Sequence, residues 1–369
     1  MGLDKLLFMI IGIGIVLGGI DHLRGNKLGL GQKFVDGLNA MGPLALGMAG
    51  MICLAPVISS NIKPLAALVY NSTGVDPALF GGLLSSDMGG YPLAMELAKD
   101  PSMALYAGLN IGTTLGCTLV FLIPLGLSII SDNDLDSFAK GIMLGIIPMP
   151  IGAVAGGLAA GFPLGSILYN TVPVLLLSLL LAVGLLLRPR LIIAGCLALG
   201  KLVSLLGTLG LVAAGFTQVT GITIIAGMEK VDVAMKIVDV IAVFLMGALP
   251  IMSLVTKAVE KRMDKKGGKA VNKDDVFGFG VTLVNPLPTF MMLPKMTEAG
   301  KVKNIAFMVS ASCTFGDYLG FTAGVEPGMT IPVIAGKLVG ALLALWVANR
   351  YTAKENKKAK SCNSCYICN

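Results

Sequence analysis

The chain alternates long apolar stretches with short polar ones, and the apolar stretches have the length of membrane-crossing helices. About 20 apolar residues span the hydrocarbon core of a bilayer, and segments 103–130 and 141–187 carry no charged side chain. The second is long enough to cross more than once. The pattern predicts about nine spanning helices, at 4–20, 39–60, 103–130, 138–161, 166–187, 191–215, 237–256, 304–325 and 329–349.

Two further apolar segments are interrupted near their centres. Segment 77–98 contains Gly89, Gly90 and Pro92, and segment 275–294 contains Asn285 followed by two prolines, Pro286 and Pro288. Proline lacks a backbone donor and clashes with the preceding helical turn. We therefore expect neither segment to be a continuous helix.

Composition and charge indicate a membrane protein and its orientation. Hydrophobic residues make up 55% of the chain and charged residues 13%, against roughly 25% in a typical soluble domain. Basic residues gather in short clusters between apolar segments, which is typical of topology signals and not of a nucleic-acid surface. The cluster in 350–360 predicts a cytoplasmic C-terminus.

The same rule decides how the interrupted segments lie. A full crossing by 275–294 would place the seven basic residues of 257–273 outside, against the positive-inside rule. A re-entrant hairpin entering from the cytoplasm keeps them inside, and irregular backbone at membrane depth is tolerated where it lines a cavity. Segment 77–98 is then a matching hairpin that enters from outside.

Short similarities between the two halves indicate an inverted repeat. Residues 41–44 recur as 246–249, Asp76 with 80–81 recurs as Asp275 with 279–280, and glycines 108/112/116 recur as 316/320/324, at offsets of about 200 residues. Paired broken segments in two halves are typical of secondary transporters. The predicted fold is an all-α polytopic bundle with a first repeat (1–161), a connecting helix (162–190), a second repeat (191–349) and a cytoplasmic basic and cysteine-containing tail (350–369).

Two isolated carboxylates, Asp87 and Asp317, are the leading candidates for a binding site. An Asp at the centre of a membrane helix costs about 2.5–3.5 kcal/mol on insertion scales, so each needs a partner, and a cationic substrate is one candidate. Asp87 could instead cap a half-helix, and Asp317 could pair with Lys337 or Lys295. Asn285 sits at the break of the second segment and offers an amide.

Aromatic residues surround these polar groups in the sequence. A ring face attracts a cation by about 0.5–2 kcal/mol, although aromatic residues in membrane helices usually serve packing. The candidates for a cation-binding wall are Tyr91, Phe290, Phe315, Tyr318 and Phe321. The candidates for backbone breaks or close helix contacts are Gly89, Gly90, Pro286, Pro288, Gly316 and Gly320.

Other motifs do not indicate catalysis or a cofactor. Residues 195–201 resemble a phosphate loop, but Leu202 stands where the hydroxyl residue is needed. His22 has no metal-ligating neighbour at suitable spacing, and no nucleophile and base are paired. Cys362, Cys365 and Cys368 alone are too few for a zinc site. We expect no enzyme activity, no metal and no cofactor.

Several motifs closely resemble the ethanolamine permease (EutH-type) family of ethanolamine-utilisation operons, over roughly 39–345. They are NAMGPLAL (39–46), Met51 with LAPV (54–57), DMGG (87–90) with ELA (96–98), GKV (300–302) and GDYLGF (316–321). Where the family often has His after the second Asp, this chain has Tyr318. The resemblance implies a bacterial cytoplasmic-membrane protein that admits ethanolamine for breakdown by a cytosolic lyase.

Ethanolamine has an ammonium group and a hydroxyl, which a buried carboxylate and a polar acceptor would satisfy. Candidate partners for the hydroxyl are Ser85, Ser86, Asn110, Thr113 and Thr114. The alternatives are a cation-coupled symporter of another small amine or amino acid, and a membrane scaffold or sensor for an amine-metabolising complex. The expected partners are ethanolamine and membrane lipids but no nucleic acid, and a homo-oligomer is left open.

Overall fold

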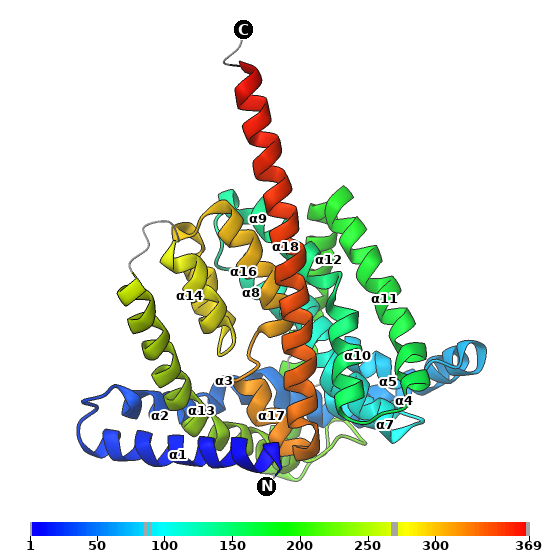
Figure 1. Ribbon diagram of the computed structural model, residues 1–369. Helices are drawn as coiled ribbons and strands as arrows, with labels where there is room; N and C mark the ends of the chain where they lie inside the picture. The colour runs from blue at the N-terminus through cyan, green and yellow to red at the C-terminus, as the bar shows by residue number, and fades with distance from the viewer. Residues whose placement is uncertain (1, 85–87, 89, 267–271, 367–369) are drawn as a thin grey trace.

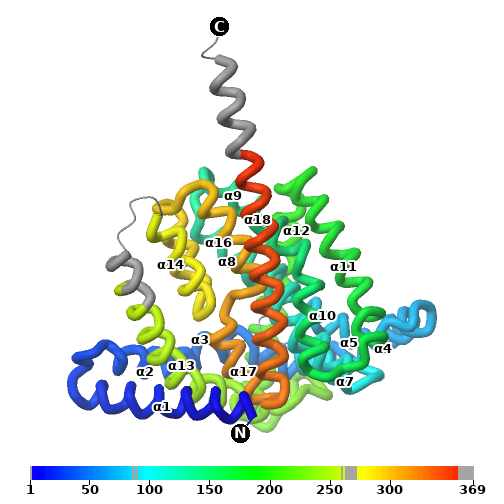
Figure 2. The backbone as a smooth tube through the Cα atoms, in the orientation of Figure 1, coloured from blue at the N-terminus to red at the C-terminus, as the bar shows by residue number. Residues whose placement is uncertain are grey.

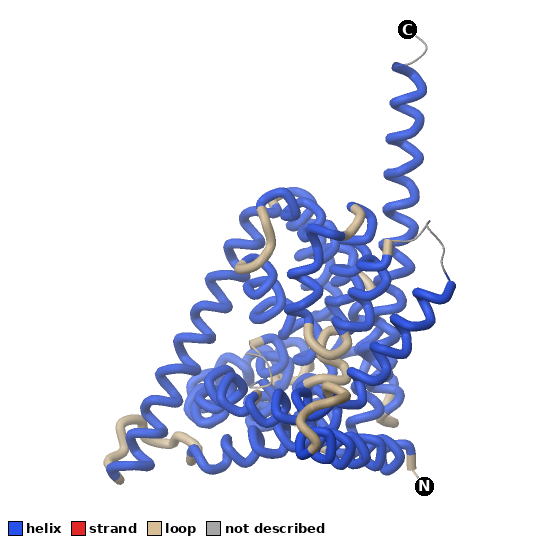
Figure 3. Tube along the Cα trace, turned by 90° about the vertical axis from the view of Figure 1, so that its left-hand side faces the viewer, coloured by secondary structure: helices blue, strands red, loops and turns tan. Residues whose placement is uncertain are grey.

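The computed structural model describes residues 2–84, 88, 90–266 and 272–366, and contains no strand in them. Figure 3 shows helices joined by short loops. In this part of the chain eight helices or helix runs are long and apolar enough to cross a membrane: α1 (Leu3–Leu23), α2–α4 (Leu30–Thr73), α7–α8 (Pro101–Leu127), Asp132–Ala159, α11 (Leu164–Leu187), α12 (Pro189–Thr220), the part of α13 (Val231–Lys266) up to Ala258, and Pro327–Glu355.

Several of these runs are segmented. The second comprises α2 (Leu30–Asn39), α3 (Met41–Leu44), the π-helix η1 (Ala45–Ala49) and α4 (Gly50–Thr73); the third comprises α7 (Pro101–Leu105), the π-helices η2 (Tyr106–Gly116) and η3 (Thr118–Leu122), and α8 (Ile123–Leu127). The fourth comprises η4 (Asp132–Asp134), α9 (Leu135–Ile146) and α10 (Met149–Ala159), and the last η6 (Pro327–Met329) and most of α18 (Thr330–Tyr366).

The predicted helix over 304–325 is wrong as a single element. It consists of the end of α16 (Glu298–Ala311) and the whole of α17 (Asp317–Val325), separated by a non-helical turn. The largest buried apolar cluster lies beside this region, where the α7–α8 run, α9, α10, α16 and α18 pack together.

Ion pairs define one end of the molecule, which we call the C-terminal end. Lys140 of α9 lies 3.4 Å from Glu355 of α18, and Lys301 of α16 lies 2.7 Å from Asp134 before α9. The starts of α9 and α16 are therefore at the end towards which α18 runs. Figure 1 shows α7 and the start of α1 at the other end, which we call the opposite end.

Helix α1 packs directly against α13 through small residues. A side chain at Gly14 would collide with the backbone of Gly247, and one at Gly247 would collide with the backbone of Ile11. Small residues at such contacts let two helix backbones approach closely. Helices α1, α2 and α13 lie side by side as a result (Figure 2).

Each interrupted segment is a pair of short helices. The first pair is α5 (Ala78–Leu83) and α6 (Gly90–Leu97). Its two ends are joined by Asp76, whose carboxylate accepts hydrogen bonds from the backbone N–H groups of Lys99, at 3.1 Å, and Asp100, at 2.9 Å. Asp100 in turn caps α7, where Pro101 occupies the first helical position.

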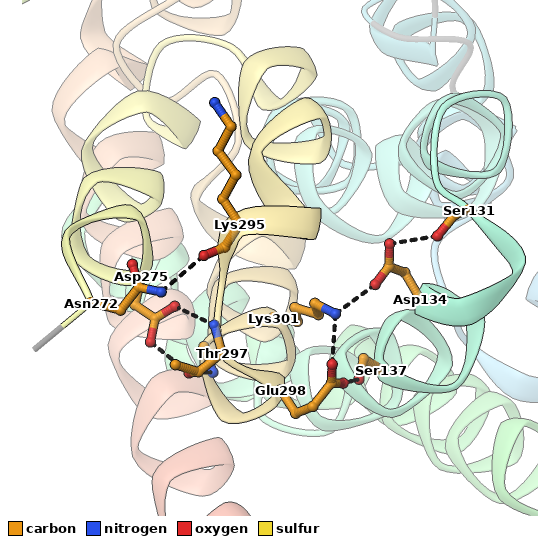
Figure 4. A network of polar contacts seen from close by, with 10 residues as sticks. Ser131, Asp134, Ser137, Asn272, Asp275, Lys295, Thr297, Glu298 and Lys301 are labelled. Carbon is orange, nitrogen blue, oxygen red and sulfur yellow. Dashed lines mark hydrogen bonds and ion pairs between the residues drawn. The ribbon is translucent and has the colours of Figure 1, made fainter.

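The second pair, α14 (Lys273–Thr282) and α15 (Pro286–Met292), is closed in a similar way (Figure 4). The Asp275 carboxylate accepts hydrogen bonds from the Thr297 backbone N–H at 2.9 Å and from the Thr297 hydroxyl at 2.6 Å. The Asn272 side chain donates to the Lys295 carbonyl, in the 3₁₀ turn η5 (Leu293–Lys295), at 2.9 Å. The pair therefore enters and leaves at the C-terminal end.

A buried lysine of α16 links this helix to the residues before α9 at this end of the bundle. Lys301 is 8% exposed and contacts two carboxylates, Asp134 and Glu298, which also accept hydrogen bonds from Ser131 and Ser137 (Figure 4). The hydrogen bond to Asp134 raises the pKa of Lys301 above its ordinary value, and the bond from Lys301 lowers the pKa of Glu298. Each partner thus stabilises the charge of the other.

Candidate functional site

The break between α16 and α17 is stabilised by contacts with residues 282–284, at the end of α14 and in the turn after it. We call these residues the tip of the second helix pair. The Cys313 backbone N–H donates to the Thr282 carbonyl at 3.1 Å, and that of Phe315 donates to the Leu283 carbonyl at 2.8 Å. Cys313 has a φ of 57°, which is uncommon for a residue other than glycine. Hydrogen bonds to another element therefore replace those that a continuous helix would have made.

Gly316 allows the close contact at this break. A Cβ at this position would overlap the carbonyl oxygen of Val284, a backbone atom of the connection between α14 and α15. Gly320, one turn further on, faces α13, where a Cβ would lie 3.0 Å from the Ile241 carbonyl oxygen. Both predicted glycine positions therefore mark close contacts of α17 with its neighbours.

Asp317 is the first residue of α17. Its carboxylate accepts a hydrogen bond from the Tyr318 backbone N–H at 3.1 Å. The positive end of the helix dipole favours a negative charge in this first turn. Asp317 is half-buried and lines two cavities, so its carboxylate can bind a cation that enters either one.

The larger cavity, of about 710 Å³, connects Asp317 with the molecular surface. At its outer part lie Lys33 and Asp36, whose side chains form an exposed ion pair at 2.9 Å. Its remaining lining comes mainly from α13 and the second helix pair, and includes Leu249, Ser253, Thr256, Phe277, Val281, Asn285 and Pro288. A small solute could thus pass from a polar mouth to the carboxylate.

The smaller cavity, of about 310 Å³, also reaches Asp317. It shares Pro43 and Leu44 with the larger cavity, so these residues of α3 lie between the two. Its other walls come from η1, η3 and α12: Leu46, Gly47, Val120, Phe121, Gly200 and Ser204. Asp317 is thus part of the lining of both the larger and the smaller cavity.

Asn285 and the prolines beside it form the turn of the second helix pair. The Asn285 side chain accepts a hydrogen bond from the Leu287 backbone N–H at 2.8 Å, which caps α15. Pro286 occupies the first position of α15, where its missing N–H costs nothing. Asn285 and Pro288 line the larger cavity together with Asp317, so the structure brings these predicted residues together.

Three of the five predicted aromatic residues, Tyr91, Tyr318 and Phe321, belong to one apolar cluster, whereas Phe290 and Phe315 lie in two others. Tyr91 packs edge-on against Phe321, with ring centres 5.8 Å apart, and Phe290 packs against Phe138 in the core. Phe315 is half-buried beside α1 and α13, and Tyr318 is 1% exposed. None of these five is among the described residues that line the two Asp317 cavities, where Phe121 and Phe277 are found instead.

The predicted polar residues of η2 are buried near α18. The Thr113 and Thr114 hydroxyls donate to backbone carbonyls one turn earlier. Asn110 is 2% exposed, and its side-chain nitrogen has no hydrogen-bond partner among the described residues. These groups do not line the two cavities in the described part of the chain, and their role with a substrate remains a prediction.

Lys337 of α18 is a buried cation next to these residues. It is 1% exposed, and its ammonium donates to the Thr113 carbonyl at 2.6 Å. The sequence indicated Lys337 only as a possible partner for Asp317. A lysine within an apolar helix needs a polar environment, as an aspartate does. The sequence could therefore have indicated Lys337 as a candidate site residue in its own right.

Part of the predicted site lies outside the described residues. This holds for Asp87, Ser85, Ser86 and Gly89. Among their neighbours, Met88 is 2% exposed, and Gly90 is the first residue of α6.

The sequence was also compared with known proteins. Residues 3–350 match a family model described as ethanolamine utilisation protein, EutH. The chain is 42% identical to "Probable ethanolamine permease EutH" of Listeria monocytogenes, over 98% of both chains. It is 38% identical to YxeR of Bacillus subtilis, over 99% of this chain and 100% of that protein. It is also 38% identical to "Probable ethanolamine permease EutH" of Escherichia coli, over 90% and 88%. No solved structure matches the chain.

Proposed function

We propose that this chain, which belongs to the EutH family of ethanolamine utilisation proteins, carries ethanolamine across the bacterial cytoplasmic membrane. Relatives that it matches over most of their length are named probable ethanolamine permeases. The eight apolar runs in the described residues fit a multi-pass membrane protein. Transport, and not catalysis, is the activity that these observations support.

The proposed architecture is an inverted repeat with two re-entrant hairpins, α5–α6 and α14–α15. It is supported by the similar closure of the two pairs. In each, an aspartate near the start of the first arm, Asp76 or Asp275, accepts hydrogen bonds from backbone groups just before the next helix. The two aspartates are about 200 residues apart in sequence. Asp76 is bonded to Asp100, just before α7, which Figure 1 places at the opposite end.

The C-terminal end is proposed to face the cytoplasm. Lys140, Lys295, Lys301 and Lys354 lie at or near this end, as do the starts of α9, α14 and α16. Such an excess of basic residues marks the cytoplasmic side. The larger cavity opens near Lys33 of α2 and Lys257 of α13.

Asp317 is proposed to bind the substrate ammonium, and its place in the lining of both cavities is the observation that carries the proposal. A charged hydrogen bond of this kind contributes about 1.5–3 kcal/mol. Asn285, which lines the same cavity, offers an amide to the hydroxyl group. Both ends of ethanolamine would then find a polar partner, with the apolar walls excluding water.

The test is saturable uptake of labelled ethanolamine by proteoliposomes at mildly acidic pH, where little free amine can leak through lipid. Asp317→Asn should lower uptake at least tenfold, because a loss of about 1.5–3 kcal/mol corresponds to roughly 10- to 150-fold. The matched control is Asp36→Asn, at the mouth of the same cavity, whose exposed ion pair contributes only about 0–1 kcal/mol. Uptake by Asp317→Asn at the wild-type level, with both variants folded, would contradict the proposal.

A further inference from the structure

The ammonium of Lys337 is enclosed within the helix bundle. The side chain is 1% exposed, and it stems from a part of α18 that is apolar enough to lie in a membrane. A lysine at such depth costs several kcal/mol unless other groups compensate the charge. Its surroundings therefore have to supply what water would otherwise supply.

Compensating groups come from η2 and α17, among others. The ammonium donates to the Thr113 carbonyl of η2 at 2.6 Å and lies 4.6 Å from the centre of the Tyr318 ring of α17. Asp317 directly precedes Tyr318 at the start of α17. A carbonyl oxygen and a ring face, with a carboxylate one residue along the chain, form an environment for a small cation.

Unsatisfied hydroxyl groups lie close to this environment. Gly340, one turn from Lys337 on α18, faces the Ser310 hydroxyl, and Thr322 is one turn from Tyr318 on α17. Neither the Ser310 nor the Thr322 hydroxyl has a hydrogen-bond partner among the described residues. A buried polar atom without a partner is rare in a folded protein, so both hydroxyls are available for a further hydrogen bond.

We propose that Lys337 is a tethered cation that takes the place of a bound sodium ion beside Asp317. Unwound or irregular backbone carbonyls commonly hold the coupling ion in transporters with broken helices. Here the Thr113 carbonyl, in a π-helix, accepts a hydrogen bond from the Lys337 ammonium, which is part of the chain itself. Uptake of substrate would then need no sodium ion. The statement about uptake rests on the proposed function, whereas the statement about the site does not.

The experiment removes the charge and asks whether a free cation replaces it. Lys337→Met and Lys337→Gln keep most of the length of the side chain but not its charge, and Lys33→Met at the exposed cavity mouth is the control. Each purified protein is melted in sodium or ammonium chloride and in an equal concentration of tetraethylammonium chloride, whose cation is too large for the site. Sodium-dependent uptake of labelled ethanolamine is measured in parallel.

We expect sodium and ammonium to raise the melting temperature of the two Lys337 variants by a few degrees, since a ligand that binds only the folded state stabilises it. Wild type and Lys33→Met should change by less than about one degree. Wild-type uptake should be the same with and without sodium, and uptake by Lys337→Gln should become sodium-dependent.

Folded Lys337 variants that respond to neither cation would overturn the inference, and so would a wild type whose uptake or melting depends on sodium. Failure of both variants to fold in either salt would also overturn it, because sodium should rescue a site that it can fill. If wild type takes up no ethanolamine, the proposed function fails. The melting experiment, which contains no substrate, still decides the role of Lys337.

Discussion

Gly300→Ala should break the hydrogen bonds between Asp275 and Thr297 that join the two ends of the second helix pair. A Cβ at Gly300 would overlap the carboxylate of Asp275. To make room, this carboxylate must leave its position, where it accepts hydrogen bonds from the Thr297 backbone N–H at 2.9 Å and from the Thr297 hydroxyl at 2.6 Å. The substitution therefore acts on the link between α14 and α16 through one side chain.

The expected loss follows from these two hydrogen bonds. A hydrogen bond to a charged group contributes about 1.5–3 kcal/mol, and Thr297 is exposed, so water replaces part of what is lost. We expect a loss of about 1.5–3 kcal/mol in total for Gly300→Ala. Asp275→Ala removes the same two bonds and should cost a similar amount. In the double variant, alanine at 300 meets no carboxylate and should add almost nothing.

The assay is the free energy of unfolding of purified protein in mixed micelles, measured for the two single variants and the double variant. Gly280→Ala is the control, because a Cβ there meets nothing within 4 Å and lies in the same helix, α14. It should be neutral or stabilise slightly, as alanine favours helix over glycine by about 1 kcal/mol. Additive losses in the double variant would refute the reasoning, since residues that act through one contact should be coupled.

Three further predictions concern the site and its orientation. Gly316→Ala should lower the melting temperature strongly because its Cβ would overlap a backbone carbonyl, whereas Gly320→Ala, whose nearest atoms would lie 3.0 Å away, should be milder. In a cysteine-free background, a cysteine at Lys295 should react with impermeant reagents only from the cytoplasm, and one at Lys99 only from outside; labelling from one side would contradict the inverted repeat. Lys301→Met should cost about 3–5 kcal/mol because it leaves a carboxylate buried without its partner. Since the pKa of Lys301 is raised from 10.5, its contribution should be complete below that pH and disappear as pH rises through the raised pKa, and unfolding of Lys301→Met should lack this alkaline loss.

The sequence was informative wherever a break has a local cause. The connection at Asn285 follows from Pro286 and Pro288, which cannot continue the preceding helix. Charge predicted a hairpin over 275–294 that enters from the cytoplasm; the structure shows two short helices there, α14 and α15, and the side they face stays a prediction. The similarity around Asp76 and Asp275 was also visible, and it corresponds to two carboxylates with matching hydrogen bonds.

The break before Asp317 has no such local cause, which explains why the prediction of one helix over 304–325 failed. No proline lies between Ser312 and Gly316. The helix stops because the N–H groups of Cys313 and Phe315 donate to carbonyls of α14 and the turn after it. The periodicity of apolar residues within 304–325 cannot predict a hydrogen bond to a distant segment. The separation of Phe315 from Tyr318 was likewise not visible in the sequence, since Phe315 packs beside α1 and α13 and the Tyr318 ring lies next to Lys337 of α18.

The contacts at this break also constrain how the site could move. The carbonyls of Thr282 and Leu283 hold the turn that precedes Asp317, and Gly316 packs against the next residue of the same connection. A displacement of α14–α15 that left α17 in place would leave buried backbone groups without partners, which costs about 1–3 kcal/mol for each. We therefore expect the tip of this pair and Asp317 to move together. In alternating access, the walls that move past them would then be α3 and α13, which line the larger cavity from the other side. A disulfide between the α14–α15 tip and the start of α17 should accordingly leave transport intact, whereas one between the tip and α13 should block it. The opposite pattern would place the moving boundary between the hairpin and the acid.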